Sequence, residues 1–438
     1  MDLRVKLPYG SGSCALQIAA DLLEPDTPNL RGGESPEPGH ARDQRAAELK
    51  IVRDALAAPI GSPRLRDIVR PGESIAVIVN DITRLTRTDL MLGPLFEELA
   101  AAGVADSDVF ITFALGIHRP QTAAERRQIV GAAIYNRVRT YDHDCRNTAE
   151  LVHIGRTSFG NEVWINRRVW EADRVILTGE IIYHLIAGYS GGRKSLVPGV
   201  AGFETTTFNH RMIFHPGSRP GLLDGNPAHE DLLEACRLAQ PDFLLNVVLR
   251  PDGSLAHAVA GHYDEAHRAG CRNVDASLRI DVGEPYDLLI ASAGGHPVDI
   301  DLRQAHKGLE NACLALKPGG TIVFFAECPD GAGIRSFEEY INRYEDDRAM
   351  RAALEREFVV GGHKAYWVAR LGRLYDVHLV SSLPESFVRR CHFTPVARDR
   401  AENQIERLIA AQPPGARVGV LPHSALTLPV AAHRAEVV

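Results

Sequence analysis

Two patterns of hydrophobic and polar positions alternate along this chain. Short runs rich in Val, Ile, Leu and Phe predict buried strands. These runs occupy residues 74–79, 109–113, 174–177, 243–248, 286–291 and 321–325. Apolar residues recur at helical spacing in residues 43–57, 94–102, 123–130, 230–238, 301–316 and 399–411. Strands alternating with helices are typical of an α/β protein with mainly parallel sheets.

A change of pattern divides the chain. Residues 269–284 are polar and charged, and a new strand–helix–strand pattern follows them. We therefore place a boundary near residue 275 and predict two α/β domains, residues 1–274 and 275–438. We expect the active site in the cleft between them, and the final strand can return to the first domain. A chain of 438 residues has room for two or three domains.

Polar side chains gather where four of the predicted strands end. The four clusters are residues 80–84 (NDITR), 116–120 (GIHRP), 179–184 (GEIIYH) and 294–299 (GGHPVD). In open α/β sheets, ligands bind at the carboxyl ends of the strands. The sequence therefore predicts one site built from all four clusters.

Residues with catalytic or ligand-binding side chains are densest in residues 183–198, YHLIAGYSGGRKSLVP. Gly191 and Gly192 allow a turn that other residues disfavour, and the amides of such a turn at the start of a helix can bind an anion. Lys194 then lies within reach of a phosphorylated cofactor. His184 lies ten residues before this lysine.

Two cofactor classes compete for this segment. A P-loop requires the pattern G-x-x-x-x-G-K-[ST], and counted from Gly188 the second glycine falls at Arg193. An ATPase of this type, or another P-loop-like nucleotide-binding protein, is therefore the weaker alternative. A pyridoxal-phosphate enzyme with a Schiff base at Lys194 stays open on these residues.

Composition narrows the class of protein. A net charge of −7 argues against nucleic acid as the partner. The seven scattered cysteines include no C-x-x-C pair and indicate reduced thiols. We find no leader, and no apolar run approaches the roughly 18 residues of a membrane span. We therefore expect a soluble cytoplasmic protein without a membrane partner.

Eight motifs together resemble the nickel-pincer-dependent lactate racemase family, whose members racemise or epimerise 2-hydroxy acids. The motifs are DITR (81–84), GIHRPQT (116–122), HLIAGYSGGRKSLVPG (184–199), FNHRM (208–212), GNPAHED (225–231), DIDLRQAHKGL (299–309), VGGHKA (360–365) and LPHSALTLP (421–429). They occur in order over most of the chain.

The resemblance implies a cofactor and the residues that hold it in the N-terminal domain. The cofactor is a nickel pyridinium-3,5-bisthiocarboxylate mononucleotide, covalently attached at Lys194 and supplied by cofactor-synthesis proteins. His210 corresponds to the protein ligand of nickel, a metal that imidazole suits. The other implied cofactor-binding residues are Asp81, Thr83, Arg84, Gly191 and Gly192.

The resemblance also implies a reaction. A base removes the hydroxyl proton of a small 2-hydroxy acid while the α-hydrogen leaves as hydride, and the resulting 2-oxo acid takes the hydride back on its other face. His118 and His184 are the implied pair of bases, and histidine can exchange a proton near neutral pH. Arg84, Gln304 and Lys307 would bind the substrate.

One position departs from the family. Many members that act on lactate have Tyr before the glutamine that Gln304 matches, whereas this chain has Arg303. A guanidinium there favours a longer substrate with a second anionic group, such as a dicarboxylic or sugar acid. The alternative is that Arg303 points into solvent.

Overall fold

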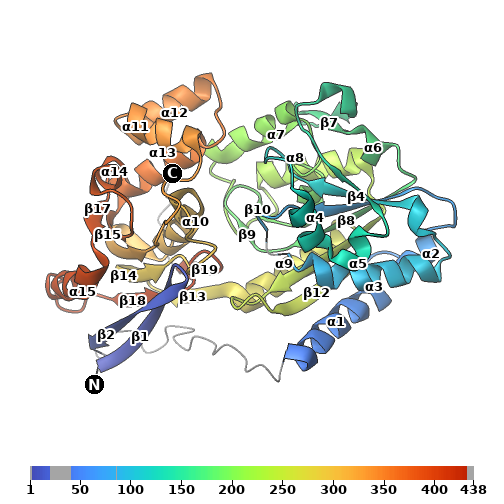
Figure 1. The fold of residues 1–438 in the computed structure, drawn as a ribbon. Coiled ribbons are helices and arrows are strands. Elements are labelled where there is room, and N and C mark those ends of the chain that lie inside the picture. Colours follow the sequence, from blue (N-terminus) through green and yellow to red (C-terminus); the bar gives the residue numbers. More distant parts are fainter. Residues whose placement is uncertain (1, 20–40, 85, 432–438) are drawn as a thin grey trace. The chain divides into compact units, whose positions relative to one another are not determined.

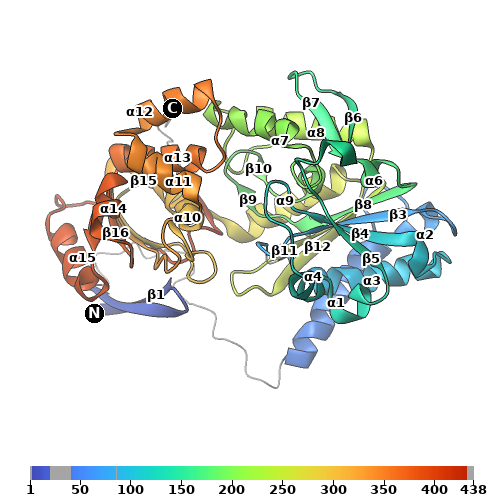
Figure 2. The ribbon, with the colours of Figure 1, turned by 45° about the horizontal axis from the view of Figure 1, so that its top comes forward.

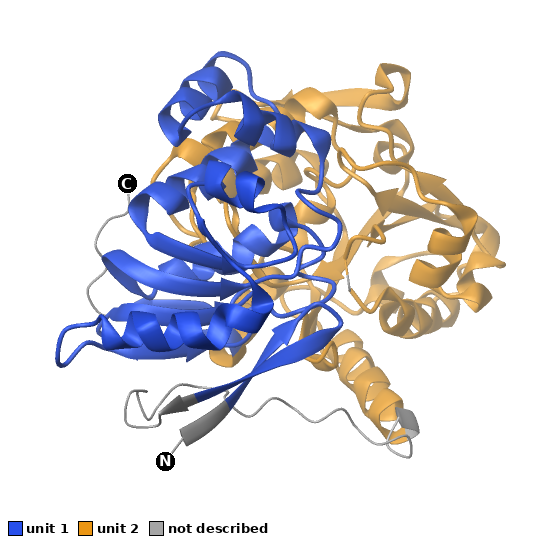
Figure 3. Ribbon diagram, turned by 60° about the vertical axis from the view of Figure 1, so that its left-hand side comes forward, with its two compact units in different colours: residues 1–33, 278–438 blue, residues 34–277 orange. Residues whose placement is uncertain are grey.

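The computed structural model describes residues 2–19, 41–84 and 86–431. The chain forms two compact units, which Figure 3 shows in two colours. Unit 1 comprises residues 1–33 and 278–438, and unit 2 comprises residues 34–277. Each unit contains its own mainly parallel sheet with helices packed on it, so the predicted α/β class is confirmed.

Unit 2 is built on a six-stranded sheet. Its strands are β3 (Ile75–Asn80), β4 (Val109–Ala114), β5 (Arg139–Asp142), β8 (Arg174–Glu180), β11 (Phe243–Leu249) and β12 (Leu255–Gly261). Their order in the sheet is β12-β11-β8-β3-β4-β5, and only β12 runs antiparallel to its neighbour. The chain passes from β3 to β4 on one side and later returns to β8 on the other. The strand order therefore reverses at β3.

Helices and two small hairpins complete unit 2. The helices are α1 (Ala41–Ala57), α2 (Leu65–Ile68), α3 (Thr88–Ala101), α4 (Ala123–Val130), α5 (Ala132–Tyr135), α6 (Arg167–Trp170), α7 (Phe203–His210), α8 (Pro227–Ala239) and α9 (Glu265–Leu278). The hairpins pair β6 (Leu151–Arg156) with β7 (Glu162–Asn166), and β9 (Tyr183–His184) with β10 (Gly188–Tyr189).

Alternation along β3 produces the core of unit 2. Ile75, Val77 and Val79 point to one face of the sheet, where they pack with Val52 of α1 and Leu95 of α3. These two helices lie side by side in Figures 1 and 2. Burying this face fixes the sheet, and with it the positions at which its strands end.

Unit 1 is built on a five-stranded parallel sheet. The strands β14 (Tyr286–Ser292), β15 (Leu316–Phe325), β16 (Asp376–Val380), β17 (Thr394–Val396) and β18 (Val418–Leu421) lie in the order β17-β16-β15-β14-β18. Its helices are α10 (Leu302–Cys313), α11 (Arg335–Arg343), α12 (Asp347–Arg356), α13 (Gly362–Leu374), α14 (Glu385–Arg390) and α15 (Ala401–Ala410). Helices α11, α12 and α13 form one cluster in Figure 2.

The first strands of the chain belong to unit 1, which corrects the predicted division. Strands β1 (Asp2–Tyr9) and β2 (Gly12–Ala19) form an antiparallel hairpin. Val5, Leu7 and Leu16 of this hairpin pack into the core of unit 1 with Leu288 and Ile290. Residues 1–33 therefore do not join residues 34–277, although the chain does change unit at residues 277 and 278, near the predicted boundary.

The last strand also stays in unit 1. Strand β19 (Leu428–Ala431) pairs in parallel with β13 (Arg279–Gly283). Within the described residues, which end at 431, the return of the final strand to the first domain, which the sequence left open, does not occur. Pairing with β13 satisfies the backbone of β19 within the unit that also contains β18.

All of the predicted strands and helices are present, most of them with shifted ends. Helix α3 begins at Thr88 rather than at Pro94, and α10 ends at Cys313 rather than at residue 316, because β15 already begins at Leu316. All seven cysteines are free thiols. Among the described residues, we find no helix that could cross a membrane.

Candidate active site

Three of the polar clusters lie at one edge of the unit 2 sheet. They follow β3, β4 and β8, which are neighbours in the order β8-β3-β4. The reversal of strand order at β3 is where an open α/β sheet binds ligands. The lysine turn, Gly192–Ser195, lies at the same edge, because Ser195 Oγ donates to the carbonyl of Thr178 in β8 at 2.7 Å.

A backbone contact joins the lysine turn to the loop after β4. The amide of Gly116 donates to the carbonyl of Gly199 at 3.0 Å, and the amide of Gly199 donates to the carbonyl of Lys194 at 3.2 Å. The turn with Lys194 and the turn with His118 are thus held together by the main chain. The positions of both side chains depend on the same short network.

Asp81 and His118 form a hydrogen-bonded pair across two strand ends. Nδ1 of His118 lies 2.5 Å from Oδ2 of Asp81, and the hydroxyl of Thr83 donates to the other carboxylate oxygen at 2.7 Å. Burial alone would raise the pKa of Asp81, but the hydrogen bonds from His118 and Thr83 and the charge of Arg84 outweigh it and lower that pKa. An ionised carboxylate only accepts, so Nδ1 of His118 donates, and in the neutral ring Nε2 keeps the lone pair.

Lys194 has an unusual amine. Burial, together with the charges of Arg193 and Arg84, lowers its pKa to about 7. A large fraction of this lysine is therefore neutral, and nucleophilic, near neutral pH. The influence of Arg84 on both Lys194 and Asp81 indicates that these side chains share one site.

One amide of the predicted anion seat at Gly191 and Gly192 is already used within the protein. The amide of Gly192 already donates to Oδ1 of Asn246 at 2.7 Å, and the turn opens a short 3-10 helix instead of an α-helix. The glycines are required for space. Both have positive φ, and a Cβ would lie 2.6 Å from Asn246 Oδ1 at Gly191 and 2.6 Å from the ring of His267 at Gly192.

His184 lies in the β9–β10 hairpin. Its Nδ1 accepts hydrogen bonds from the amides of Ile186 and Ala187, both at 3.2 Å. In a neutral ring this arrangement puts the proton on Nε2. In the neutral rings, Nε2 therefore carries a proton in His184 and a lone pair in His118.

His210 is the last residue of α7, and a hydrogen bond determines which of its ring nitrogens carries the proton. Its Nδ1 lies 2.8 Å from the carbonyl of Thr206, so Nδ1 donates and Nε2 is the nitrogen that can bind a metal. The preceding Asn209 donates to Asp231 and to the carbonyl of Ala228, both at 2.9 Å, which fixes this end of α7 on α8. The chemistry of the imidazole fits nickel. Among the described residues, no three His, Cys, Asp or Glu side chains lie close enough together to hold a metal ion.

The predicted substrate residues on α10 belong to unit 1. Nζ of Lys307 donates to Oε1 of Gln304 at 2.7 Å, so the two side chains form one pair on the helix. The Arg303 side chain is only 19% exposed and lies 3.6 Å from Asp301, and its Nε is buried without a hydrogen-bond partner in the described structure. The alternative of Arg303 in open solvent is therefore not what the structure shows.

The fourth polar cluster lies in unit 1, whereas the other three lie in unit 2. It follows β14, which belongs to the sheet of unit 1. Asp299 accepts hydrogen bonds from the amides of Gly10 at 2.8 Å and Glu327 at 3.1 Å, and so ties the N-terminal hairpin to the end of β15. His296 is exposed. That the end of β14 contributes to one site with the other three strand ends stays a prediction.

Three residues that support the site were not predicted from the sequence: Asn246, Asp231 and Asp275. Asn246 could have been found, because it is a polar residue within the buried apolar strand FLLNVVL. Asp231 lies in a motif that was noted, yet its links to Thr157, Asn161 and Asn209 connect distant segments. Nothing in the sequence around Asp275 indicates that it supports the site.

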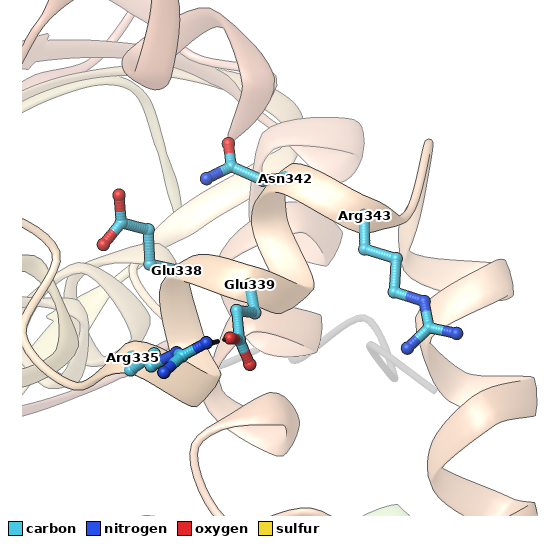
Figure 4. A pocket seen from close by; sticks show the side chains of 5 residues that line it. All are labelled: Arg335, Glu338, Glu339, Asn342 and Arg343. Carbon is cyan, nitrogen blue, oxygen red and sulfur yellow. Dashed lines mark hydrogen bonds and ion pairs between the residues drawn. The ribbon is translucent and has the colours of Figure 1, made fainter.

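A surface depression in unit 1 has different chemistry. It is lined by exposed residues of α11, namely Arg335, Glu338, Glu339, Asn342 and Arg343 (Figure 4). Arg335 and Glu339 form an ion pair at 2.6 Å within it. None of the predicted site residues lines this depression, so it gives no support to an active site there.

Both units are similar to known protein families. Residues 35–221 match the family described as Lactate racemase N-terminal domain, and residues 282–424 match Lactate racemase C-terminal domain. The lactate racemase of Thermoanaerobacterium thermosaccharolyticum is 32% identical over 405 residues, which cover 91% of this chain and 92% of the relative. The lactate racemase of Lactiplantibacillus plantarum is 33% identical over 306 residues, 69% of this chain and 72% of the relative.

Solved structures show the same fold. The lactate racemase apoprotein from Thermoanaerobacterium thermosaccharolyticum superposes with a TM-score of 0.86 at 29% identity, over 98% of this chain and 100% of that one. A Thermotoga maritima protein superposes with a TM-score of 0.64 at 16% identity, over 89% of this chain and 98% of that one. The second similarity concerns the fold alone.

Proposed function

This chain belongs to the lactate racemase family, and from that premise we propose that it racemises or epimerises a 2-hydroxy acid with the nickel-pincer nucleotide. When bound, this cofactor would accept the α-hydrogen of the substrate as hydride and return it. The remaining work of catalysis falls to side chains of the protein, which bind the substrate and move the hydroxyl proton.

The residues present fit the cofactor. Lys194 offers an amine with a pKa near 7, which suits a covalent bond to a thiocarboxylate group. His210 offers Nε2 to nickel, because its Nδ1 is used by the carbonyl of Thr206. Arg84 is an exposed cation beside Lys194 and suits the phosphate or the substrate carboxylate.

We propose His118 as one base. Its Nε2 carries the lone pair while Asp81 holds the ring through Nδ1, so the ring can take the hydroxyl proton without a change of tautomer. The charge of Asp81 then stabilises the imidazolium that forms. This pair is the observation that carries the proposal, because a base oriented by a buried carboxylate at a switch point serves proton transfer.

We propose His184 as the second base. In the neutral ring its Nε2 carries a proton and can donate to the substrate oxygen while His118 accepts. For His184 to take a proton at Nε2 in the opposite direction, its ring must give up the two 3.2 Å contacts with the amides of Ile186 and Ala187. Both contacts are at the upper end of the usual range of hydrogen-bond distances.

We propose that Gln304 and Lys307 bind the substrate carboxylate, and that Arg303 binds a second anionic or polyhydroxy end. The buried Nε of Arg303 without a partner supports this role, since such a donor is costly unless a ligand satisfies it. The proposed substrates are therefore dicarboxylic or sugar 2-hydroxy acids in preference to lactate.

One experiment tests the proposed function. The protein is purified after co-expression with the cofactor-synthesis proteins, bound nickel is measured, and a panel of 2-hydroxy acids is screened for loss of optical purity. Nickel together with racemisation or epimerisation supports the proposal. Nickel without turnover of any acid would instead indicate a cofactor carrier, and a borohydride-sensitive chromophore without nickel would indicate pyridoxal phosphate.

A further inference from the structure

The hairpin that carries His184 is too small to fix that histidine by itself. Strands β9 and β10 have two residues each, with His184 opposite Gly188 and Tyr183 opposite Tyr189. Even longer isolated two-stranded hairpins are marginally stable in water. The position of His184 must therefore depend on what packs against the hairpin.

Helix α9 provides this support at two points. Nε2 of His267 lies 2.8 Å from the carbonyl of Ser190, just after β10. Asp275 lies eight positions further along the same helix. Its carboxylate accepts a hydrogen bond from the hydroxyl of Tyr183 at 2.8 Å and from that of Tyr189 at 2.7 Å.

The contact with Asp275 holds both strands of the hairpin at once. Tyr183 is in β9, directly before His184, and Tyr189 is its partner in β10. Both rings are buried, and their centroids lie 5.4 Å apart. Hydrogen bonds to an ionised carboxylate are stronger than those between neutral groups. Two of them on one carboxylate fix the spacing of the tyrosines, and the backbone of His184 follows Tyr183.

We propose that Asp275 is a positioning residue for His184 and acts through Tyr183 and Tyr189. The proposal rests on the proposed function, in which the His184 ring meets the substrate. This role requires no contact of Asp275 with substrate or cofactor.

The first test follows the His184 ring in the apoprotein. The variants are Asp275→Ala, Tyr183→Phe and Tyr189→Phe, and the controls are Tyr135→Phe in α5 and Arg272→Ala, an exposed position of α9. NMR titration with isotope-labelled histidine gives the imidazole signals, and that of His184 is identified by its loss in His184→Gln. We expect the titration midpoint or line shape of His184 to change in all three variants, while the His118 signal stays as in the wild type. Both controls should leave both signals unchanged.

The second test uses the loaded enzyme. Small displacements of a catalytic group can lower the rate by up to about 100-fold. We expect kcat to fall roughly tenfold to 100-fold in the three variants, with KM within about twofold because the carboxylate-binding residues are untouched. Bound nickel and the mass of the Lys194 adduct should equal those of the wild type.

The outcomes separate this inference from the proposed function. An unchanged His184 signal in all three variants would overturn the positioning role, whatever the activity. A changed His184 signal in a protein whose wild type converts no 2-hydroxy acid would support the positioning and reject the proposed function. If Asp275→Ala fails to fold, the two Tyr→Phe variants decide, since each removes only a hydroxyl.

Discussion

Nδ1 of His118 lies 2.5 Å from Oδ2 of Asp81, and the carboxylate, not the imidazole, is the buried member of the pair, with side-chain exposures of 4% and 37%. A buried anion below an exposed ring orients the ring and leaves its outer nitrogen accessible. The contact joins the ends of β3 and β4, two strands that share a buried core.

The first prediction concerns this pair. Asp81→Asn replaces an obligate acceptor by an amide that can also donate, so His118 can adopt the tautomer with its proton on Nε2. We expect kcat to fall by about 10²- to 10⁴-fold, the range for a disabled general base. Initial rates of racemisation in both directions measure the effect. Turnover within about threefold of wild type would show that Asp81 does not control the His118 tautomer.

The two histidines can be tested separately. If each enantiomer loses its hydroxyl proton to a different base, racemisation in either direction uses both, so His118→Ala and His184→Ala should each suppress both directions by about 10²- to 10⁴-fold. Chiral chromatography of reactions started from each pure enantiomer provides the measurement. A single variant with near-normal turnover would reopen a mechanism with one base.

Lys194 yields a prediction with a pH dependence. Its lowered pKa of about 7 means that the neutral amine grows as pH rises through 7 and is nearly complete above pH 8, whereas a lysine of ordinary pKa (~10.4) is still protonated there. Acylation of the apoprotein, followed by peptide mapping, should show labelling of Lys194 with a midpoint near pH 7. Labelling that rises only above pH 9 would contradict this.

The same lysine is the predicted attachment point of the cofactor. Intact-mass analysis of active protein should show an adduct that Lys194→Ala removes. Full activity in a protein without any adduct would disprove covalent attachment.

His210 is the predicted nickel ligand, and His215 provides a matched control. Nδ1 of His215 accepts from the amide of Gly217 at 3.0 Å, which leaves the proton of a neutral ring on Nε2, the opposite of His210. We expect His210→Ala to lose nickel or activity with an unchanged circular dichroism spectrum, and His215→Ala to retain both. Metal analysis of the two purified variants measures this, and nickel with full turnover in His210→Ala would assign the ligand elsewhere.

Substrate choice depends on Arg303 in our proposal. A second anion gains a charge-assisted partner there, at roughly 1.5 to 3 kcal/mol, which favours such acids over lactate by about tenfold or more. Arg303→Tyr should shift the ratio of kcat/KM for a dicarboxylic or sugar acid against lactate toward lactate. Arg335→Tyr, at an exposed arginine of α11, should leave that ratio as it is. An unchanged ratio in Arg303→Tyr would mean that specificity is set by other residues.

The strands and helices that depend on the local pattern of apolar and polar residues could be predicted from the sequence. An apolar run such as Ile75–Asn80 can only be buried, so β3 and the polar residues after it were found from spacing alone. Contacts between residues far apart in the sequence could not be predicted from local patterns. Asn246 accepts from the amide of Gly192 across 54 positions, so one amide of the predicted anion seat is already in use. Likewise the hairpin β1–β2 packs on strands near residue 290, and no local pattern could assign it to unit 1.

The division of unit 1 into two stretches of chain has a consequence for biosynthesis. A ribosome makes β1 and β2 first, yet Gly10 of their turn donates to Asp299, 289 positions later. Unit 2 is continuous and can fold as it emerges, as domains generally do. The hairpin must wait until β14 and β15 are synthesised before Val5, Leu7 and Leu16 can be buried. We expect nascent chains stalled within unit 2 to expose this apolar hairpin, and chaperones that recognise such surface to bind them there.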